Sequence, residues 1–289
     1  MPPTALPAAP APLLRAPLHK DGRLALGPAL DGPGHAYYRL MTPRRMHHGV
    51  IVADPGAGAS NLATVLMVTA RASIPLATAY VNGRGEPANP ALARQVTALL
   101  DGDDVAETAL AALERAVDVR RGLLTAAQAC SYTAAGLPAV LVVVKNADRV
   151  FTGRGHRWAT VARQAGLLGI GLLATMADTG LSSFGGSSTL RELLCDQLVV
   201  LRTHDPRVKT AVFAAMGPLA PDRWPTGVGR VLGPDGAGPL FASFRLSPSG
   251  TDALVERCRR RWLVTHRDTE LDAPTAHAFA AAADRGGAA

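Results

Sequence analysis

The segment that most constrains the fold is Ala139–Val144, which reads AVLVVV and follows the turn sequence Gly136-Leu137-Pro138. A strand that is apolar at every position is buried on both faces, which is typical of a central strand in a parallel sheet. Other short apolar runs read as strands of the same sheet: His48–Ala53, Leu76–Val81, Leu168–Thr175 and Gln197–Arg202. We therefore expect a central, mainly parallel sheet.

Segments with helical periodicity alternate with these strands. The predicted helices are Ser60–Ala72, Pro90–Leu100, Val105–Ala127 and Trp158–Ala165, with Asp101–Asp104 as an acidic break before the third. Strands that alternate with helices predict an α/β fold, in which helices flank the sheet and the crossovers are right-handed.

The two ends of the chain differ from this pattern. Residues 1–34 hold many of the 22 prolines, so we expect a disordered arm that leaves room for a short strand at Arg23–Gly27. The folded domain is expected over residues 35–267. The tail, residues 268–289, is rich in alanine and charge and is expected to be a frayed helix or disordered.

Charge alone does not select a partner. The chain has 30 Lys plus Arg against 23 Asp plus Glu, a net charge of +7, and its lysines are Lys20, Lys145 and Lys209 alone. This balance is compatible with nucleic acid or an anionic membrane as a partner and selects neither. The run Arg257–Arg261 would contact a DNA backbone or form a solvated helix face.

Cysteine and histidine spacing excludes two kinds of site. The three cysteines form no CxxC pair, and the eight histidines show no HxxxH or HExxH spacing, so we expect neither a disulfide framework nor a metal site. The chain has no run of 18 apolar residues and no signal-peptide pattern. We expect a cytoplasmic protein without stable membrane insertion, recruited to a membrane only through a partner.

The turn after the first main strand is an altered phosphate loop. In the pattern GxxxxGK[ST], backbone amides wrap the phosphates, Lys neutralises their charge and the hydroxyl holds Mg²⁺. Residues 53–61 read ADPGAGASN, which keeps Gly58 and Ser60 but has Ala53 for the first Gly and Ala59 for the Lys. Asp54 adds a negative charge where phosphates would lie. A ligand-free turn and a weakened nucleotide site both stay open.

The acidic partner strand is altered as well. A nucleotide-hydrolysing ATPase needs a carboxylate at the end of a buried strand for Mg²⁺, usually followed by Glu. The strand Ala139–Val144 is followed instead by Lys145 and Asn146, with Asp148 one turn later. Lys145 would take the place of the missing cation, either by binding phosphate or by pairing with Asp54.

These segments together resemble the motor domain of the FtsK/SpoIIIE/HerA family of DNA-translocating ATPases, which has a RecA-like P-loop NTPase fold. Ser60-Asn61 resembles the SN of the family's GxTGSGKSN loop, and Val142–Val150 its VVIDEFAEL strand. Arg163–Met176 resembles RAAGIHLVLATQ, with Met176 at the sensor position. Cys195–Val208 and the hairpin Arg223–Gly236 resemble later segments, so the likeness spans roughly residues 36–265.

The resemblance assigns roles to particular residues. It implies a degenerate nucleotide loop made of Gly56, Ala57, Gly58, Ala59, Ser60 and Asn61. It places Lys145 and Asn146 where the acidic pair belongs, and Arg207 where an arginine acting on a neighbouring subunit is expected. No catalytic residue and no metal ligand is assigned, and ATP with Mg²⁺ would bind only weakly.

We therefore expect a degenerate FtsK/SpoIIIE-like module in DNA transfer or partitioning, of the kind found in actinobacterial plasmid transfer. It would be a non-hydrolysing partner of an active translocase or would self-assemble, as a hexamer in the family's manner, on double-stranded DNA. Two alternatives stay open: an active ATP-dependent DNA translocase with an atypical site, and a protein-binding pseudo-ATPase module of a secretion system.

Overall fold

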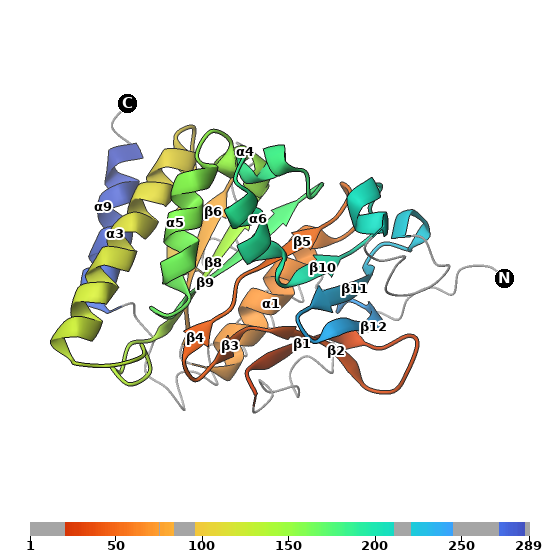
Figure 1. The fold of residues 1–289 in the computed structure, drawn as a ribbon, viewed down its shortest axis with the longest axis horizontal. Helices are drawn as coiled ribbons and strands as arrows, with labels where there is room; N and C mark the ends of the chain where they lie inside the picture. The colour runs from red at the N-terminus through yellow and green to blue at the C-terminus, as the bar shows by residue number, and fades with distance from the viewer. Residues whose placement is uncertain (1–20, 75, 84–95, 211–220, 245–271, 287–289) are drawn as a thin grey trace.

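The computed structural model describes residues 21–74, 76–83, 96–210, 221–244 and 272–286. Its centre is an eight-stranded sheet (Figure 1). In spatial order the strands are β12 (Gly236–Ala242), β11 (Val228–Gly233), β10 (Leu198–Val200), β5 (Gly49–Val52), β9 (Ile170–Met176), β8 (Ala139–Lys145), β6 (Leu76–Asn82) and β7 (Ala98–Leu100). The strands from β10 to β7 are parallel, and β11 and β12 extend the sheet in antiparallel fashion. The α/β architecture expected from the sequence, with a central and mainly parallel sheet, is confirmed.

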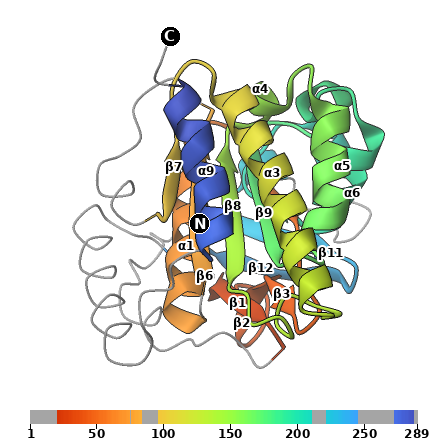
Figure 2. The same cartoon turned by 90° about the vertical axis from the view of Figure 1, so that its left-hand side faces the viewer.

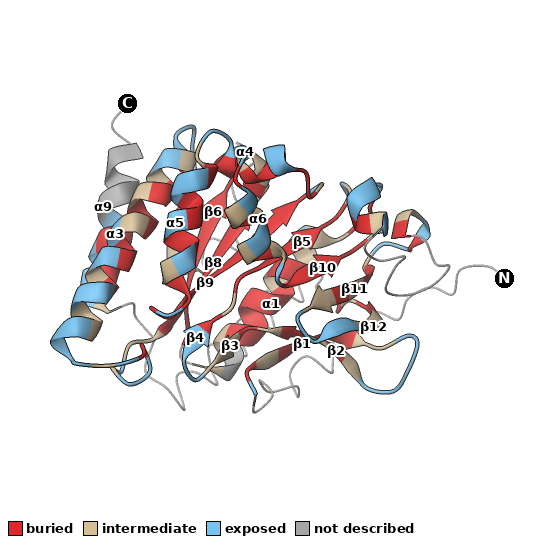
Figure 3. Cartoon of the chain, viewed as in Figure 1, coloured by how far each residue is buried: buried red, intermediate tan, exposed pale blue. Residues whose placement is uncertain are grey.

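Burial on both faces explains the apolar run of β8. Val140, Val142 and Val144 belong to one hydrophobic cluster, whereas Leu141 and Val143 belong to another. Because successive side chains of a strand point to opposite faces, the two clusters lie on opposite sides of the sheet. Figure 3 shows the inner strands of the sheet buried along most of their length, whereas the strands at its two edges are partly exposed.

Helices cover both faces. Helix α1 (Ala59–Ser73) shares its cluster with Leu141 and with the two-stranded sheet of β1 (Arg23–Pro28) and β2 (His35–Arg39). The other face carries α3 (Val105–Ala126), α4 (Ala147–Phe151), α5 (Gly155–Ala165), α6 (Ser188–Cys195) and α9 (Ala273–Gly286). The remaining short elements are β3 (Met41–Thr42), β4 (Arg45–Met46) and the 3₁₀ turns η2 (Leu181–Phe184) and η3 (Pro221–Arg223).

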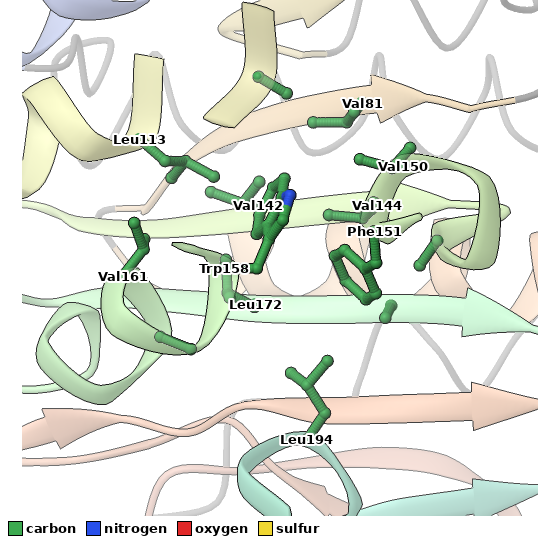
Figure 4. Packing of buried hydrophobic residues seen from close by; sticks show 14 of the residues in the cluster. Val81, Leu113, Val142, Val144, Val150, Phe151, Trp158, Val161, Leu172 and Leu194 are labelled. Carbon is green, nitrogen blue, oxygen red and sulfur yellow. The ribbon is translucent and has the colours of Figure 1, made fainter. Parts of the chain in front are cut away.

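Trp158 is the largest side chain of the helical layer. It is fully buried, and its ring lies 5.0 Å from that of Phe151, between centroids. Figure 4 shows Trp158 between β8 and α3, close to Val142 and Leu113. The pair belongs to the hydrophobic cluster between the sheet and these helices.

The expected arm and tail need correction. Residues 21–34 contain β1, which was expected, but Leu24 and Leu26 are fully buried, so the folded part begins before residue 35. Helix α9 is not frayed at its start, because Phe279 is buried against the cluster that includes α3 (Figure 2). Residues 1–20 lie outside the described residues.

One predicted helix is wrong at its end. Within Pro90–Leu100, residues 90–95 lie outside the described residues, and Ala98–Leu100 form β7 rather than helix. Leu99 pairs in parallel register with Tyr80 of β6. Edge pairing with β6 therefore overrides the local helical preference of this short segment.

Candidate nucleotide loop

The altered phosphate loop joins β5 to α1 through two glycines in the left-handed region. Gly56 has φ 77° and Gly58 has φ 108°, conformations that glycine adopts without steric cost. Gly58 is the N-cap of α1, and no side chain caps the helix. Ala57 between them is fully buried. Gly56 and Gly58 therefore stand at the two positions where this turn needs a left-handed backbone.

Several backbone amides of the loop are already bonded within the protein. Ala53 N–H donates to the Met176 carbonyl at 3.0 Å, and Asp54 N–H donates to the Arg202 carbonyl at 2.9 Å. Ala57 N–H donates to the Asp54 carbonyl at 3.0 Å. These amides would have to break bonds to wrap a phosphate. The positive end of the α1 helix dipole still favours an anion at this end of the helix.

Asp54 is held by His204. The His204 backbone N–H donates to Asp54 Oδ1 at 3.2 Å, and the imidazole Nδ1 bonds to Oδ2. The Asp54 side chain is 21% exposed, against 71% for His204. This pair joins the loop after β5 to the segment after β10, and the partner that the structure gives Asp54 is His204 rather than Lys145. The carboxylate is fixed in place at the loop.

The far side of the loop packs on the antiparallel extension of the sheet. Gly227 N–H donates to the Ala57 carbonyl at 3.0 Å. Asn61 Nδ2 donates to the Phe244 carbonyl at 2.7 Å, so this side chain ties α1 to the end of β12. Ser60, the hydroxyl expected to hold Mg²⁺, is exposed. Hydrogen bonds therefore hold the loop and the start of α1 on two sides, to the segment after β10 and to the segments that flank β11 and β12.

Lys145 and Asn146 lie at the carboxyl end of β8, two strands from β5. Lys145 pairs in register with Asn82 of β6, and its carbonyl accepts a hydrogen bond from Gly83 N–H at 3.0 Å. Asn146 adopts a left-handed conformation (φ 49°) as the N-cap of α4, and its N–H donates to Thr175 Oγ1 at 3.2 Å. Asn is one of the few residues that tolerate this conformation. Its role here is to turn the chain into α4.

Along the sequence, Asp148 is the first carboxylate after the end of β8. It lies in the first turn of α4 and is half-buried. A carboxylate near a helix N-terminus is favoured by the helix dipole, which accounts for it without a metal. In the part of the chain that the structure describes, no group of three His, Cys, Asp or Glu side chains could hold a metal ion.

Arg207 is exposed in the segment after β10, with no ion pair to another described residue. Its backbone N–H donates to Asp205 Oδ1 at 3.0 Å. Asp205 is buried and its other oxygen accepts bonds from Thr179 N–H at 2.6 Å and Thr179 Oγ1 at 2.8 Å. Asp205 thus fixes the backbone of the segment that carries Arg207, and the Arg207 guanidinium lies beside Gly180.

His204 and Asp205 were not singled out from the sequence. Their signal was the polar run Thr203-His204-Asp205 directly after a buried strand, at the edge where the carboxyl ends of parallel strands meet. The Arg257–Arg261 run, which was considered for DNA, lies outside the described residues. Among the helices that are described, none is long and apolar enough to cross a bilayer.

The residues present fit a magnesium-bound nucleoside triphosphate poorly. Three amides of the loop already donate to backbone carbonyls, the Asp54 carboxylate lies at the loop, and Ala59 carries no charge. A charge-assisted contact is typically worth about 1.5–3 kcal/mol, so its loss alone weakens binding by roughly ten- to a hundredfold.

No protein-family model matches the sequence, and no curated protein matches it. Solved structures do match the fold. The cytoplasmic domain of the type VII secretion ATPase EccC from Thermomonospora curvata has a TM-score of 0.67 at 18% identity, over 86% of this chain and 32% of that chain. ATPases 2 and 3 of the same organism's EccC, in complex with a signal sequence peptide, give 0.64 at 18% identity, over 84% and 48%.

A conjugation protein matches equally well. The pCW3 conjugation coupling protein TcpA, in its monomer form with ATPγS, has a TM-score of 0.64 at 13% identity, over 85% of this chain and 73% of that chain. The chain therefore has the fold of the FtsK/HerA-type P-loop ATPase domains, as the sequence resemblance implied. It spans less than half the length of either EccC chain.

Proposed function

We propose that this chain is a non-hydrolysing FtsK/HerA-type module that works beside an active ATPase in DNA transfer or protein secretion. The observation that supports this most is the Asp54–His204 pair, which fixes a carboxylate at a loop that has no lysine. An anionic nucleotide would have to displace the pair or bind beside its negative charge. Lys145 and Asn146 put a cation and a neutral amide at the strand end, where an ATPase of this family would have the acidic pair that serves Mg²⁺.

The choice between DNA transfer and secretion rests on the partner. The neighbours in fold include a conjugation coupling protein and secretion ATPases, one of them with a signal sequence peptide. Of the two settings we propose DNA transfer, with which the net charge of +7 is compatible, because phosphate contacts release counterions from duplex DNA. Arg207 would then act on the site of a neighbouring active subunit, in a mixed or self-assembled ring in the cytoplasm or at a membrane-bound partner.

Steady-state ATP hydrolysis tests the non-hydrolysing role. We expect no turnover above that of buffer, with or without duplex DNA and Mg²⁺, and no change on Ser60→Ala. Turnover that is lost on Ser60→Ala would overturn the proposal and favour an active translocase in which Lys145 supplies the missing charge.

Binding of a duplex at two salt concentrations separates the two settings. A DNA-transfer module should lose affinity steeply between 50 and 200 mM salt, on the order of tenfold or more. Binding of a signal sequence peptide, together with no salt-dependent binding of the duplex, would instead support a protein-binding module of a secretion system.

A further inference from the structure

A second polar site lies at the opposite end of the sheet from the nucleotide loop. A groove of about 150 Å³ lies between β1–β2 and the turn that joins β11 to β12. Its side chains include Arg23, His35, Tyr37, Arg39 and Gln197. Because Gln197 precedes β10, the groove lies near the amino ends of the parallel strands, whereas the loop follows their carboxyl ends.

Two arginines stand directly opposite each other in this groove. Arg23 of β1 pairs with Arg39 of β2 in antiparallel register. Like charges directly opposite across two strands are destabilising. Along β2, His35, Tyr37 and Arg39 are half-buried while Ala36 and Tyr38 are buried, so the half-buried face is the one that lines the groove. The fold thus gathers two guanidinium groups on one face of this strand pair.

Each arginine already has a carboxylate partner in the chain, Asp21 for Arg23 and Asp235 for Arg39. Arg39 Nη2 bonds to Asp235 Oδ2, and Asp235 is 71% exposed at the tip of the turn. The pKa of Arg23 is raised by its hydrogen bond to Asp21 and, among smaller causes, by the charge of Asp235. Asp235 therefore acts on both arginines. Its turn, Pro234–Asp235, contains only these two residues between the paired Gly233 and Gly236.

The backbone of Arg39 is held in place by a buried side-chain amide. The Gln197 amide accepts a bond from Arg39 N–H at 2.8 Å and donates one to the Arg39 carbonyl at 2.9 Å, and Gln197 is buried. The Arg23 guanidinium lies over the Tyr37 ring, 5.9 Å from its centroid. An exposed ion pair to a turn residue is weak, so a better anion can displace Asp235 from a preformed cationic surface.

We propose that this groove, which we name the arginine groove, binds a small oxyanion group, carboxylate or phosphate, in the place of Asp235. Paired guanidinium groups suit such planar or tetrahedral anions because several N–H groups can bond one anion together. The volume of the groove admits a group about the size of one six-membered ring. This site is independent of the nucleotide loop and of the function proposed for it.

Calorimetric titration of the full chain with inorganic phosphate and with succinate tests the proposal and distinguishes the two chemistries. Removing the internal competitor with Asp235→Asn should raise the affinity for one or both anions by about tenfold relative to the unaltered protein. Arg39→Gln in the Asp235→Asn background should abolish that gain. If urea unfolding shows that Arg39→Gln destabilises the protein, Arg23→Gln in the same background serves instead and should also abolish the gain.

The matched control is Asp118→Asn. It makes the same change in net charge and also releases a surface arginine, Arg121, whose partner it is. We expect it to leave anion affinity unchanged. No gain in Asp235→Asn for either anion, or an equal gain in Asp118→Asn, would overturn the proposal.

Discussion

Asp54, at the end of β5, accepts a hydrogen bond from the backbone of His204 at 3.2 Å, although the two residues are 150 positions apart. The imidazole of His204 bonds to the second carboxylate oxygen. The contact closes the loop on the side of β10. It makes the negative charge at position 54 a fixed part of the loop, which bears directly on what the loop can bind.

Restoring the phosphate loop should require two changes. Ala59→Lys alone should improve ATP binding little, because the new ammonium group would lie beside the Asp54 carboxylate and be neutralised by it. Ala59→Lys combined with Asp54→Gly should tighten binding by roughly a hundredfold, since it adds one charge-assisted contact and removes a repulsion. Titration of a fluorescent ATP analogue checks this. Equal gains in the single and double variants would show that Asp54 does not oppose the nucleotide.

Stability should fall in mild acid because of His48. This buried imidazole accepts a bond from Leu172 N–H at Nδ1 (3.1 Å) and donates from Nε2 to the Ala162 carbonyl (2.8 Å), so its neutral form is fully bonded. Burial lowers the pKa of His48 to about 4. The unfolded chain, with a pKa near 6.5, binds the proton first, so stability is full above pH 6.5 and falls as the pH drops towards 4.

Between pH 7 and pH 5, the preferential protonation of His48 in the unfolded chain should lower the free energy of unfolding by about 2 kcal/mol. Urea unfolding at the two pH values measures it. His48→Gln removes the titrating group, so its loss of stability between pH 7 and pH 5 should be smaller than that of the unaltered protein by this amount. The same loss in both proteins would show that His48 is not the group responsible.

Arg120 should be essential for docking α9. It is fully buried and donates to the Leu168 carbonyl at 3.0 Å, to Asp272 at 2.9 Å and to Thr275 at 3.2 Å. Arg120→Met leaves these acceptors without a donor and should lower the free energy of unfolding by about 3 kcal/mol. Limited proteolysis should then cut before α9.

The neighbouring residue is the control for Arg120. Arg121 is exposed, and its ion pair with Asp118 lies on the surface. Arg121→Ala should change the free energy of unfolding by less than about 0.5 kcal/mol. Urea unfolding of both variants makes the comparison, and similar effects at the two positions would contradict the docking role of Arg120.

Trp158 should be the most costly position in the helical layer. Trp158→Ala leaves a cavity beside Phe151 and should destabilise the protein by about 4 kcal/mol. Leu167 is 56% exposed, so Leu167→Ala should have little effect. Chemical unfolding checks both, and a small loss for Trp158→Ala would mean that the layer repacks around it.

The sequence predicted those parts of the fold that local pattern determines. The apolar run of β8 predicted a central strand, and its six residues are buried. β7 was misread because Ala98–Leu100 has local helical preference, and only pairing with β6 makes it a strand. Helix α9 was underestimated, since the partner that holds it, Arg120, is 152 positions from Asp272.

In the candidate site, too, features set by the local sequence could be predicted and contacts between distant segments could not. The missing lysine at position 59 and the replaced acidic pair are read directly from the sequence. The Asp54–His204 contact joins segments far apart in the chain, so no spacing rule could reveal it. The arginine groove, in which Asp235 bonds to Arg39 across 196 positions, is of the same kind.

The most direct test of the non-hydrolysing role is titration of the unaltered chain with ATP, with and without Mg²⁺. A loop with a fixed carboxylate and no lysine predicts weak binding, towards millimolar, that magnesium does not improve. Micromolar binding that depends on Mg²⁺ and is lost on Ser60→Ala would contradict it.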